Sequence, residues 1–239
     1  MSDHPLRLGH RGTRVSDTAA ENTRAAFDQA LQLGCDGFEF DVRRTACGHA
    51  VICHDEKVEG VNVARAACGQ LQSLPRLADV LALYAGRAFL DIELKVPGLE
   101  SDVIVALREH PPERGYVVSS FLPEVLLDLR ARSADVTLGF ISDHKKKIER
   151  WRDLPVEYVI PKQTLITSRL VQDVQSAGKS VLTWTVNDKK VMQKLADWGV
   201  DGIISDDPQL LVRVFPDTVT GLRKKASRSA ANSSRADAL

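Results

Sequence analysis

Two carboxylates stand two residues apart in Gly37–Arg43, a stretch that alternates between apolar and charged side chains. A period of two predicts a β-strand in which Phe38 and Phe40 share one face and Glu39 and Asp41 share the other. Two like charges this close repel each other unless a cation lies between them. A hard divalent cation with oxygen ligands, Mg²⁺ or Ca²⁺, would be the simplest relief. A solvent-facing acidic strand is the alternative interpretation.

The other side chains suited to chemistry also follow short apolar runs. A single histidine at a strand end is ordinarily a hydrogen-bonded residue, and an E-x-K pair is ordinarily a solvated ion pair. Such residues become informative only if the fold brings them to one place. They are His10, Arg11, His54, Glu93, Lys95 and Trp184.

Short strand-like runs alternate with helical segments along most of the chain. The helical segments show apolar stripes, and several are closed by glycine, as at Gly34 and Gly178. We predict helices over 21–34, 77–84, 102–108, 124–132, 146–154, 168–177, 189–198 and 208–214. We predict strands over 6–12 (with its turn), 37–43, 50–53, 89–95, 116–121, 137–141, 158–160, 181–186 and 202–205.

Regular alternation of this kind predicts a parallel sheet, because parallel neighbours need crossover helices. About eight units in roughly 220 residues predict a single (β/α)₈ TIM barrel, here with a short insertion after the second strand. A doubly wound open sheet is the alternative, but no G-x-G-x-x-G follows the first strand.

The barrel would gather the polar residues, because chemistry in such barrels lies at the C-terminal ends of the strands. Three carboxylates suit a divalent metal, and an arginine with a lysine suits a phosphate. Two histidines can act as acid and base near neutral pH, so the set predicts cleavage of a phosphate ester. The predicted site comprises the metal ligands Glu39, Asp41 and Glu93, the acid–base pair His10 and His54, and the substrate-binding Arg11, Lys95 and Trp184.

Composition limits the other functions. The 239 residues carry 32 Lys and Arg against 32 Asp and Glu, so no basic field predicts nucleic-acid binding. Residues 1–221 are predicted to form the barrel domain, and 222–239 to form a basic, disordered tail. No secretory signal or stable membrane insertion is predicted, which favours a cytoplasmic protein. The four cysteines lack C-x-x-C spacing and are expected to be reduced thiols rather than zinc ligands.

In order and spacing, a series of short motifs resembles the glycerophosphodiester phosphodiesterase family, over about residues 6–212. The resemblance implies a TIM barrel that hydrolyses glycerophosphodiesters to glycerol 3-phosphate and an alcohol. It also implies the same metal ligands, acid–base pair and phosphate-binding residues as those inferred above. The motifs are His10-Arg-Gly12, Glu21-Asn-Thr23, Gly37-x-Glu39-x-Asp41, His54-Asp55, Glu93-Leu-Lys95, Trp184-Thr-Val-Asn187 and Asp201-Gly-Ile-Ile204.

Two departures from the family's motifs concern the substrate. The Arg-Thr-Thr stretch that usually follows the His-Asp pair is absent after His54-Asp55, and Ala20 stands where a proline is common. A more open mouth could therefore admit other head groups. A phospholipase-like phosphodiesterase acting on intact lipids and a non-catalytic barrel that binds phosphate metabolites are the alternative hypotheses. The sequence specifies no oligomeric state.

Overall fold

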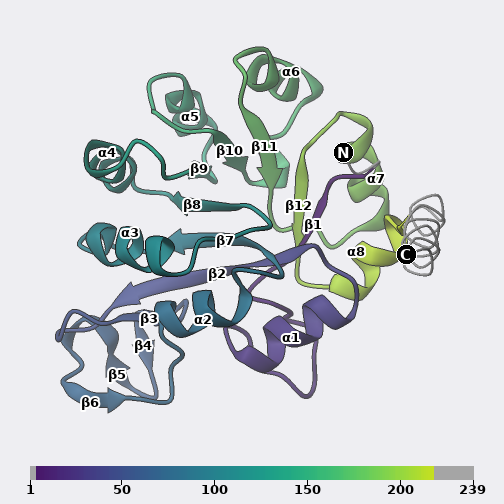
Figure 1. Ribbon diagram of the computed structural model, residues 1–239. Helices are drawn as coiled ribbons and strands as arrows, with labels where there is room; N and C mark the ends of the chain where they lie inside the picture. The colour runs from purple at the N-terminus through teal and green to yellow at the C-terminus, as the bar shows by residue number, and fades with distance from the viewer. Residues whose placement is uncertain (1–3, 218–239) are drawn as a thin grey trace, which may run out of the picture.

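A barrel of eight parallel strands forms the centre of the protein in the computed structural model, which describes residues 4–217, the side chain of Cys68 excepted. The barrel closes because β1 pairs with both β12 and β2, which confirms the predicted TIM barrel and excludes the open sheet (Figure 1). The predicted tail, 222–239, lies outside the described residues. The barrel strands are β1 (Leu6–Gly9), β2 (Gly37–Arg44), β7 (Phe89–Leu94), β8 (Tyr116–Ser120), β9 (Leu138–Ser142), β10 (Tyr158–Pro161), β11 (Ser180–Thr183) and β12 (Gly202–Ser205).

Helices follow the strands and surround the barrel (Figure 1). The first helix begins later than predicted because the Thr23 side chain caps it, accepting a hydrogen bond from the backbone N of Ala26 at 3.3 Å. The predicted helix over 146–154 is instead a short α-helix followed by a 3₁₀ turn. The helices are α1 (Arg24–Gln32), α2 (Leu77–Tyr84), α3 (Glu100–Glu109), α4 (Pro123–Arg132), α5 (Lys145–Ile148), α6 (Ser168–Ser176), α7 (Lys189–Asp197) and α8 (Pro208–Val214), with 3₁₀ turns η1 (Val63–Arg65), η2 (Glu149–Arg152) and η3 (Gln163–Leu165).

The alternation predicted for β2 is present in the structure. Phe38 and Phe40 are fully buried against the helices, and the Phe38 ring stacks on Phe27 of α1 with a centroid separation of 4.2 Å. The opposite face of the strands fills the barrel. There a cluster that includes Leu8 and Ile204 closes the interior below the polar residues. The apolar packing on both faces therefore fixes where the carboxylates of β2 must lie.

Gly37 leaves no room for a side chain where β2 packs against β7. A Cβ at this position would lie 1.9 Å from the backbone oxygen of Phe89, its register partner in β7. We expect Gly37→Ala to lower the melting temperature sharply or to prevent folding, because the added methyl must push two paired strands apart. Gly86→Ala is the matched control, since a Cβ there meets nothing closer than 3.8 Å. Equal melting temperatures for the two variants, measured by circular dichroism, would contradict this register of β2 on β7.

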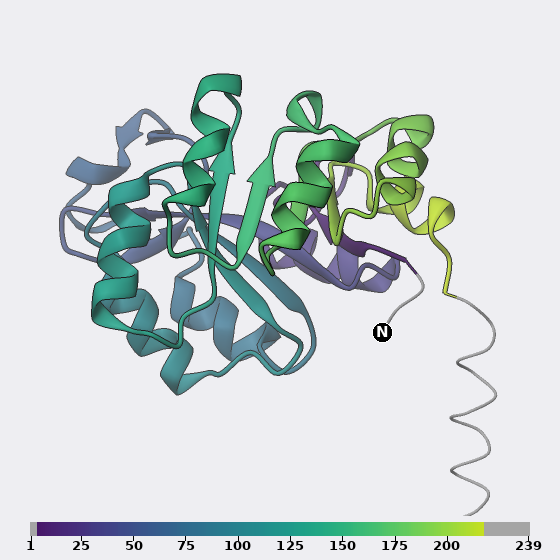
Figure 2. The same cartoon turned by 90° about the horizontal axis from the view of Figure 1, so that it is seen from above.

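The insertion after β2 lies at one end of the barrel. Its first strand, β3 (Ala50–Ile52), pairs antiparallel with β2. Figures 1 and 2 both place the insertion on the side of the barrel opposite α7 and α8. A small core of its own includes Val51, Cys53 and Val63. Its remaining strands are β4 (Lys57–Val58), β5 (Val61–Asn62) and β6 (Cys68–Leu71).

The prediction that all four cysteines are reduced thiols is wrong for Cys47, which is disulfide-bonded. Cys35 and Cys53 are free, as predicted, and both are buried. The absence of C-x-x-C spacing argues against a local metal or redox motif, but it does not report which residues the fold brings together. Cys47 belongs to the insertion, whose core is small, and a covalent link is a common way to stabilise such a segment.

None of the helices within residues 4–217 is both long and apolar enough to cross a lipid bilayer.

Candidate active site

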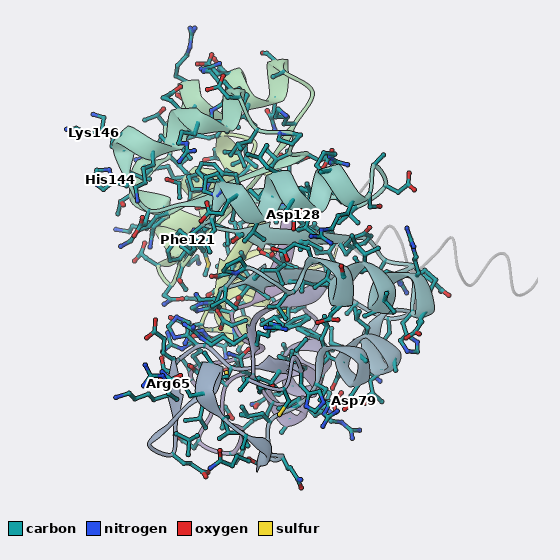
Figure 3. All side chains as sticks on the ribbon, turned by 90° about the vertical axis from the view of Figure 1, so that its left-hand side faces the viewer. Arg65, Asp79, Phe121, Asp128, His144 and Lys146 are labelled. Atoms are coloured by element: carbon teal, nitrogen blue, oxygen red, sulfur yellow. The ribbon has the colours of Figure 1, made fainter. Side chains whose placement is uncertain are left out.

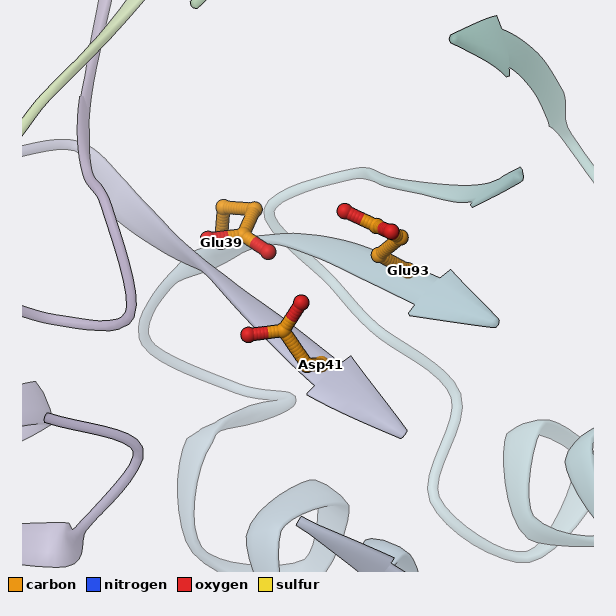
Figure 4. A group of neighbouring side chains, drawn as sticks. All are labelled: Glu39, Asp41 and Glu93. Carbon is orange, nitrogen blue, oxygen red and sulfur yellow. The ribbon is translucent and has the colours of Figure 1, made fainter. Parts of the chain in front are cut away.

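Strand register brings the predicted metal ligands together. In the parallel pair β2 and β7, Asp41 lies opposite Glu93, and Glu39 lies opposite Asp91. Figure 4 shows the side chains of Glu39, Asp41 and Glu93 converging from these two strands. Each offers one carboxylate oxygen, these oxygens lie within 4.8 Å of one another, and all three residues are buried. The spacing of Glu39 and Asp41 in β2, together with the register of β7, thus places three carboxylates in one compact group.

Asp41 is the best-neutralised carboxylate of the three. Its Oδ2 lies 3.1 Å from Nε of Arg11 and accepts a hydrogen bond from Nδ2 of Asn22 at 2.9 Å. Its Oδ1 lies 3.3 Å from Nζ of Lys95. Burial by itself would raise the pKa of Asp41, but Lys95, Arg11 and the Asn22 amide outweigh it and hold that pKa below its usual value.

The negative charges of Glu39 and Glu93 are less well balanced by neighbouring positive charges. Burial, followed by the charges of Asp41 and Glu93, raises the pKa of Glu39 well above its usual range. Burial also raises the pKa of Glu93 to about 7, although Nζ of Lys95 lies 2.5 Å from its Oε1. Such raised values mark an excess of buried negative charge.

The free oxygen of Glu39 supports a metal between these carboxylates. Its Oε2 accepts a hydrogen bond from the backbone N of Arg11 at 3.0 Å, whereas its buried Oε1 has no hydrogen-bond partner among the described residues. A separation of at most 4.8 Å is within reach of a single ion that contacts each oxygen at about 2.3–2.6 Å, as Ca²⁺ does. The residues therefore fit a hard divalent cation.

A cavity of about 140 Å³ at this end of the barrel contains most of the predicted site. Asp41 does not line it but is 1% exposed and contacts Arg11 and Lys95, which do. The seven other predicted residues all line the cavity, namely His10, Arg11, Glu39, His54, Glu93, Lys95 and Trp184.

The two histidines differ in how they are held. The imidazole of His10 is 12% exposed, and its Nδ1 lies 2.6 Å from Oδ1 of Asp206. Asn187 in turn donates from Nδ2 to the other oxygen of Asp206 at 2.7 Å. Burial opposes ionisation of Asp206, but the hydrogen bonds from His10 and Asn187 lower its pKa to about 2. His54 is more exposed, and its Nδ1 lies 2.8 Å from Oδ1 of Asp55.

One wall of the cavity is apolar. Trp184 follows β11 and donates from Nε1 to the backbone oxygen of Ile160 at 3.1 Å, which fixes the indole. Phe121 follows β8, and its ring meets that of Trp184 edge-on at 5.5 Å. Nζ of Lys95 lies 5.7 Å from the centre of the Phe121 ring. The cavity thus places a charged half beside a half suited to carbon atoms.

Sequence reasoning missed four residues of the site. Asn22 was noted only as part of a motif, yet it supports Asp41. Asp206 follows β12 directly, so its position at a strand end was a usable signal. Phe121 is apolar and gave no signal. Asp91 lines the cavity and occupies the same face of β7 as Glu93, and burial raises its pKa to about 7.

Known proteins resemble this chain over most of its length. Residues 10–84 and 89–210 match the family described as the glycerophosphoryl diester phosphodiesterase family. The glycerophosphodiester phosphodiesterase of Caldanaerobacter subterraneus subsp. tengcongensis is 30% identical over 240 residues, with 87% of this chain and 97% of the relative covered. A probable glycerophosphodiester phosphodiesterase 2 of Mycobacterium tuberculosis is 31% identical over 237 residues, covering 86% of this chain and 89% of the relative.

A solved structure shows the same fold with a product bound. An Oleispira antarctica phosphodiesterase, determined in complex with the product sn-glycerol-3-phosphate, has a TM-score of 0.77 and 26% identity, covering 88% of this chain and 96% of that chain. The matched regions contain every predicted site residue, and the barrel is the one that the matched structures share. The chain therefore belongs to the glycerophosphodiester phosphodiesterase family of phosphodiester hydrolases.

Proposed function

We propose that this enzyme hydrolyses glycerophosphodiesters to sn-glycerol 3-phosphate and an alcohol, with one divalent cation, Mg²⁺ or Ca²⁺, held by Glu39, Asp41 and Glu93. The observation that carries the proposal is the convergence of these carboxylates with two histidines and two cationic side chains around one cavity. When bound, the cation would polarise the phosphoryl oxygen and offset the excess negative charge.

The cavity walls suggest how a diester is oriented. Arg11 and Lys95 supply positive charge beside the metal ligands, where they suit the anionic phosphate. Phe121 and Trp184 form the apolar wall, where they suit the carbon skeleton of glycerol. A phosphate and a short polyol chain would thereby be held in one orientation.

His10 and His54 suit the two proton transfers of the reaction. In the first step one imidazole accepts the proton of a glycerol hydroxyl as its oxygen bonds to phosphorus. The bond from phosphorus to the alcohol oxygen breaks, and the other imidazole protonates that oxygen. Water then attacks the cyclic phosphate with the proton transfers reversed, which opens the ring to glycerol 3-phosphate. Asp206 supports His10, since a carboxylate on Nδ1 fixes the tautomer and orientation of the ring.

A panel of glycerophosphodiesters tests this proposal. Each diester is incubated with enzyme that has been stripped of metal and then given Mg²⁺ or Ca²⁺, and glycerol 3-phosphate is measured by a coupled assay. We expect release of glycerol 3-phosphate from at least glycerophosphocholine or glycerophosphoethanolamine. Absence of product from the whole panel with every metal would overturn the proposed function.

Asp206→Asn tests the support of His10. We expect kcat to fall about 10- to 100-fold, because the amide retains the shape but not the charge that stabilises a protonated imidazole. KM should stay within about threefold, since Asp206 does not line the cavity. Asp197→Asn, an exposed change at the end of α7, is the matched control. A kcat equal to that of the control would remove the positioning role.

A further inference from the structure

A second cavity, of about 220 Å³, lies beside the catalytic one at the base of the insertion. The last two residues of β2, Arg43 and Arg44, both line it. Val63 of η1 and Val96, which follows Lys95, line it from other sides. The cavity thus lies between the end of β2, the insertion and the loop after β7.

A hydrogen bond joins a lining residue of one cavity to a lining residue of the other. Nε of Arg43 donates a hydrogen bond to the backbone oxygen of His54 at 2.7 Å, and the His54 side chain lines the catalytic cavity. Arg43 also follows Asp41 by two residues on β2, so it lies on the same face about 6–7 Å further along the strand. A substrate held by its phosphate beside Asp41 would need only a few more atoms to reach Arg43.

The positive charge in the second cavity has no ion-pair partner within the described part of the chain, although Arg43 is close enough to Asp55 to help lower the pKa of that carboxyl. Neither Arg43 nor Arg44 has a carboxylate oxygen within 4.0 Å of its guanidinium among residues 4–217. The terminal nitrogens of Arg43 have no protein partner there, because its one side-chain hydrogen bond uses Nε. Glu56 and Asn62 also line the cavity. The carboxylate of Glu56 lies more than 4.0 Å from the guanidinium nitrogens of both arginines. By contrast, Arg11 is paired with Asp41 and Glu21.

We propose that this second cavity is the subsite for the alcohol half of the substrate and that it selects alcohols carrying a carboxylate. The proposal rests on the proposed function, because it assigns the group that leaves. Each of the two guanidinium groups offers a pair of N–H donors that matches a carboxylate, and Glu56 could receive a neighbouring ammonium group. A glycerophosphodiester of serine has both groups at the required end.

Two substrates that differ in one group provide the test. Glycerophosphoserine carries a carboxylate that glycerophosphoethanolamine lacks, and both release the same glycerol 3-phosphate. We expect kcat/KM of the wild-type enzyme to be at least about tenfold higher for the serine diester, the usual scale of a charge-assisted hydrogen bond. Arg44→Met should remove most of that preference by lowering the serine value about tenfold, with the ethanolamine value changed less than about twofold.

Two further variants separate recognition from other effects. Arg43→Met should act in the same direction on the serine diester, and any equal loss on both diesters would report its support of the His54 backbone instead. Arg65→Met changes an exposed cation of the insertion that does not line the cavity. Arg65 lies on the same edge of the molecule as Phe121 (Figure 3). The Arg65→Met change should leave both substrates unaffected, so it controls for the general electrostatic field.

The outcomes for the two proposals are distinct. Equal kcat/KM for the two diesters in the wild type, or an Arg44→Met loss shared by both, overturns the carboxylate subsite while leaving the proposed function intact. If no diester is hydrolysed, the proposed function fails, and calorimetry decides the subsite separately. In that measurement the His10→Ala chain should bind glycerophosphoserine at least about tenfold more tightly than glycerophosphoethanolamine. Equal affinities would overturn the subsite.

Discussion

Removal of divalent metal should abolish hydrolysis of glycerophosphodiesters, and Mg²⁺ or Ca²⁺ should restore it. Glu39→Gln, Asp41→Asn and Glu93→Gln should each lower kcat/KM on the order of 10³-fold, equivalent to about 4 kcal/mol of transition-state stabilisation. The physical reason is the compact donor set, in which the three carboxylate oxygens lie within 4.8 Å of one another. The measurement is initial rate against metal concentration after dialysis with chelator.

Stability provides the control for the metal-ligand variants. Burial and the neighbouring carboxylates raise the pKa of Glu39 above that of a glutamate in the unfolded chain. In the metal-free protein this costs folding free energy as the pH rises above the usual pKa of a glutamate, and the cost reaches its full size above the raised pKa. Glutamine carries no such charge, and Glu39→Gln should therefore melt no lower than the wild type in metal-free buffer near pH 8. Full activity in excess chelator, or activity of Glu39→Gln close to that of wild type, would contradict a metal role.

Replacement of either histidine is the second change with a large expected effect. His10→Ala and His54→Ala should each lower kcat on the order of 10²- to 10⁴-fold, the usual contribution of a positioned acid or base. KM should change little, because the charged residues that suit the phosphate, Arg11 and Lys95, remain. His110→Ala at the end of α3 is the matched control and should behave as the wild type.

A diester with an activated alcohol distinguishes the two histidines. Nitrophenolate leaves without protonation, so loss of the general acid should matter much less for a glycerophosphodiester of p-nitrophenol than for glycerophosphocholine. We expect one variant, His10→Ala or His54→Ala, to regain most of its activity on the activated substrate while the other stays impaired. Turnover of glycerophosphocholine within about threefold of wild type in either variant would contradict the acid–base pair.

The barrel and the face shared by its candidate metal ligands could be predicted because they depend on local patterns. Alternation in β2 fixes that Glu39 and Asp41 share a face, and regular strand–helix spacing implies that Glu93 lies at the same barrel end. The direct opposition of Asp41 and Glu93 depends on strand register, which depends on the close approach at Gly37. Because that contact joins two strands, the register cannot be predicted from the sequence of either strand alone.

Asp206 was missed because its role depends on a long-range contact. Asp206 and His10 are separated by 196 positions in the sequence, and only closure of the barrel brings β12 beside β1. The disulfide at Cys47 was missed for the same reason, since sequence spacing does not report proximity in space. The observed helix boundaries also differ from the predicted ones where a capping side chain determines the first helical residue, as Thr23 does for α1.

The position of the metal ion tests the central claim most directly. Crystals of the wild-type protein grown with Mn²⁺, a divalent ion with strong anomalous scattering, would report where the cation binds. We expect a single strong anomalous peak with carboxylate oxygens of Glu39, Asp41 and Glu93 as its nearest protein atoms. A strong peak elsewhere and none at these three residues, in crystals of enzyme that is active with Mn²⁺, would contradict the claim.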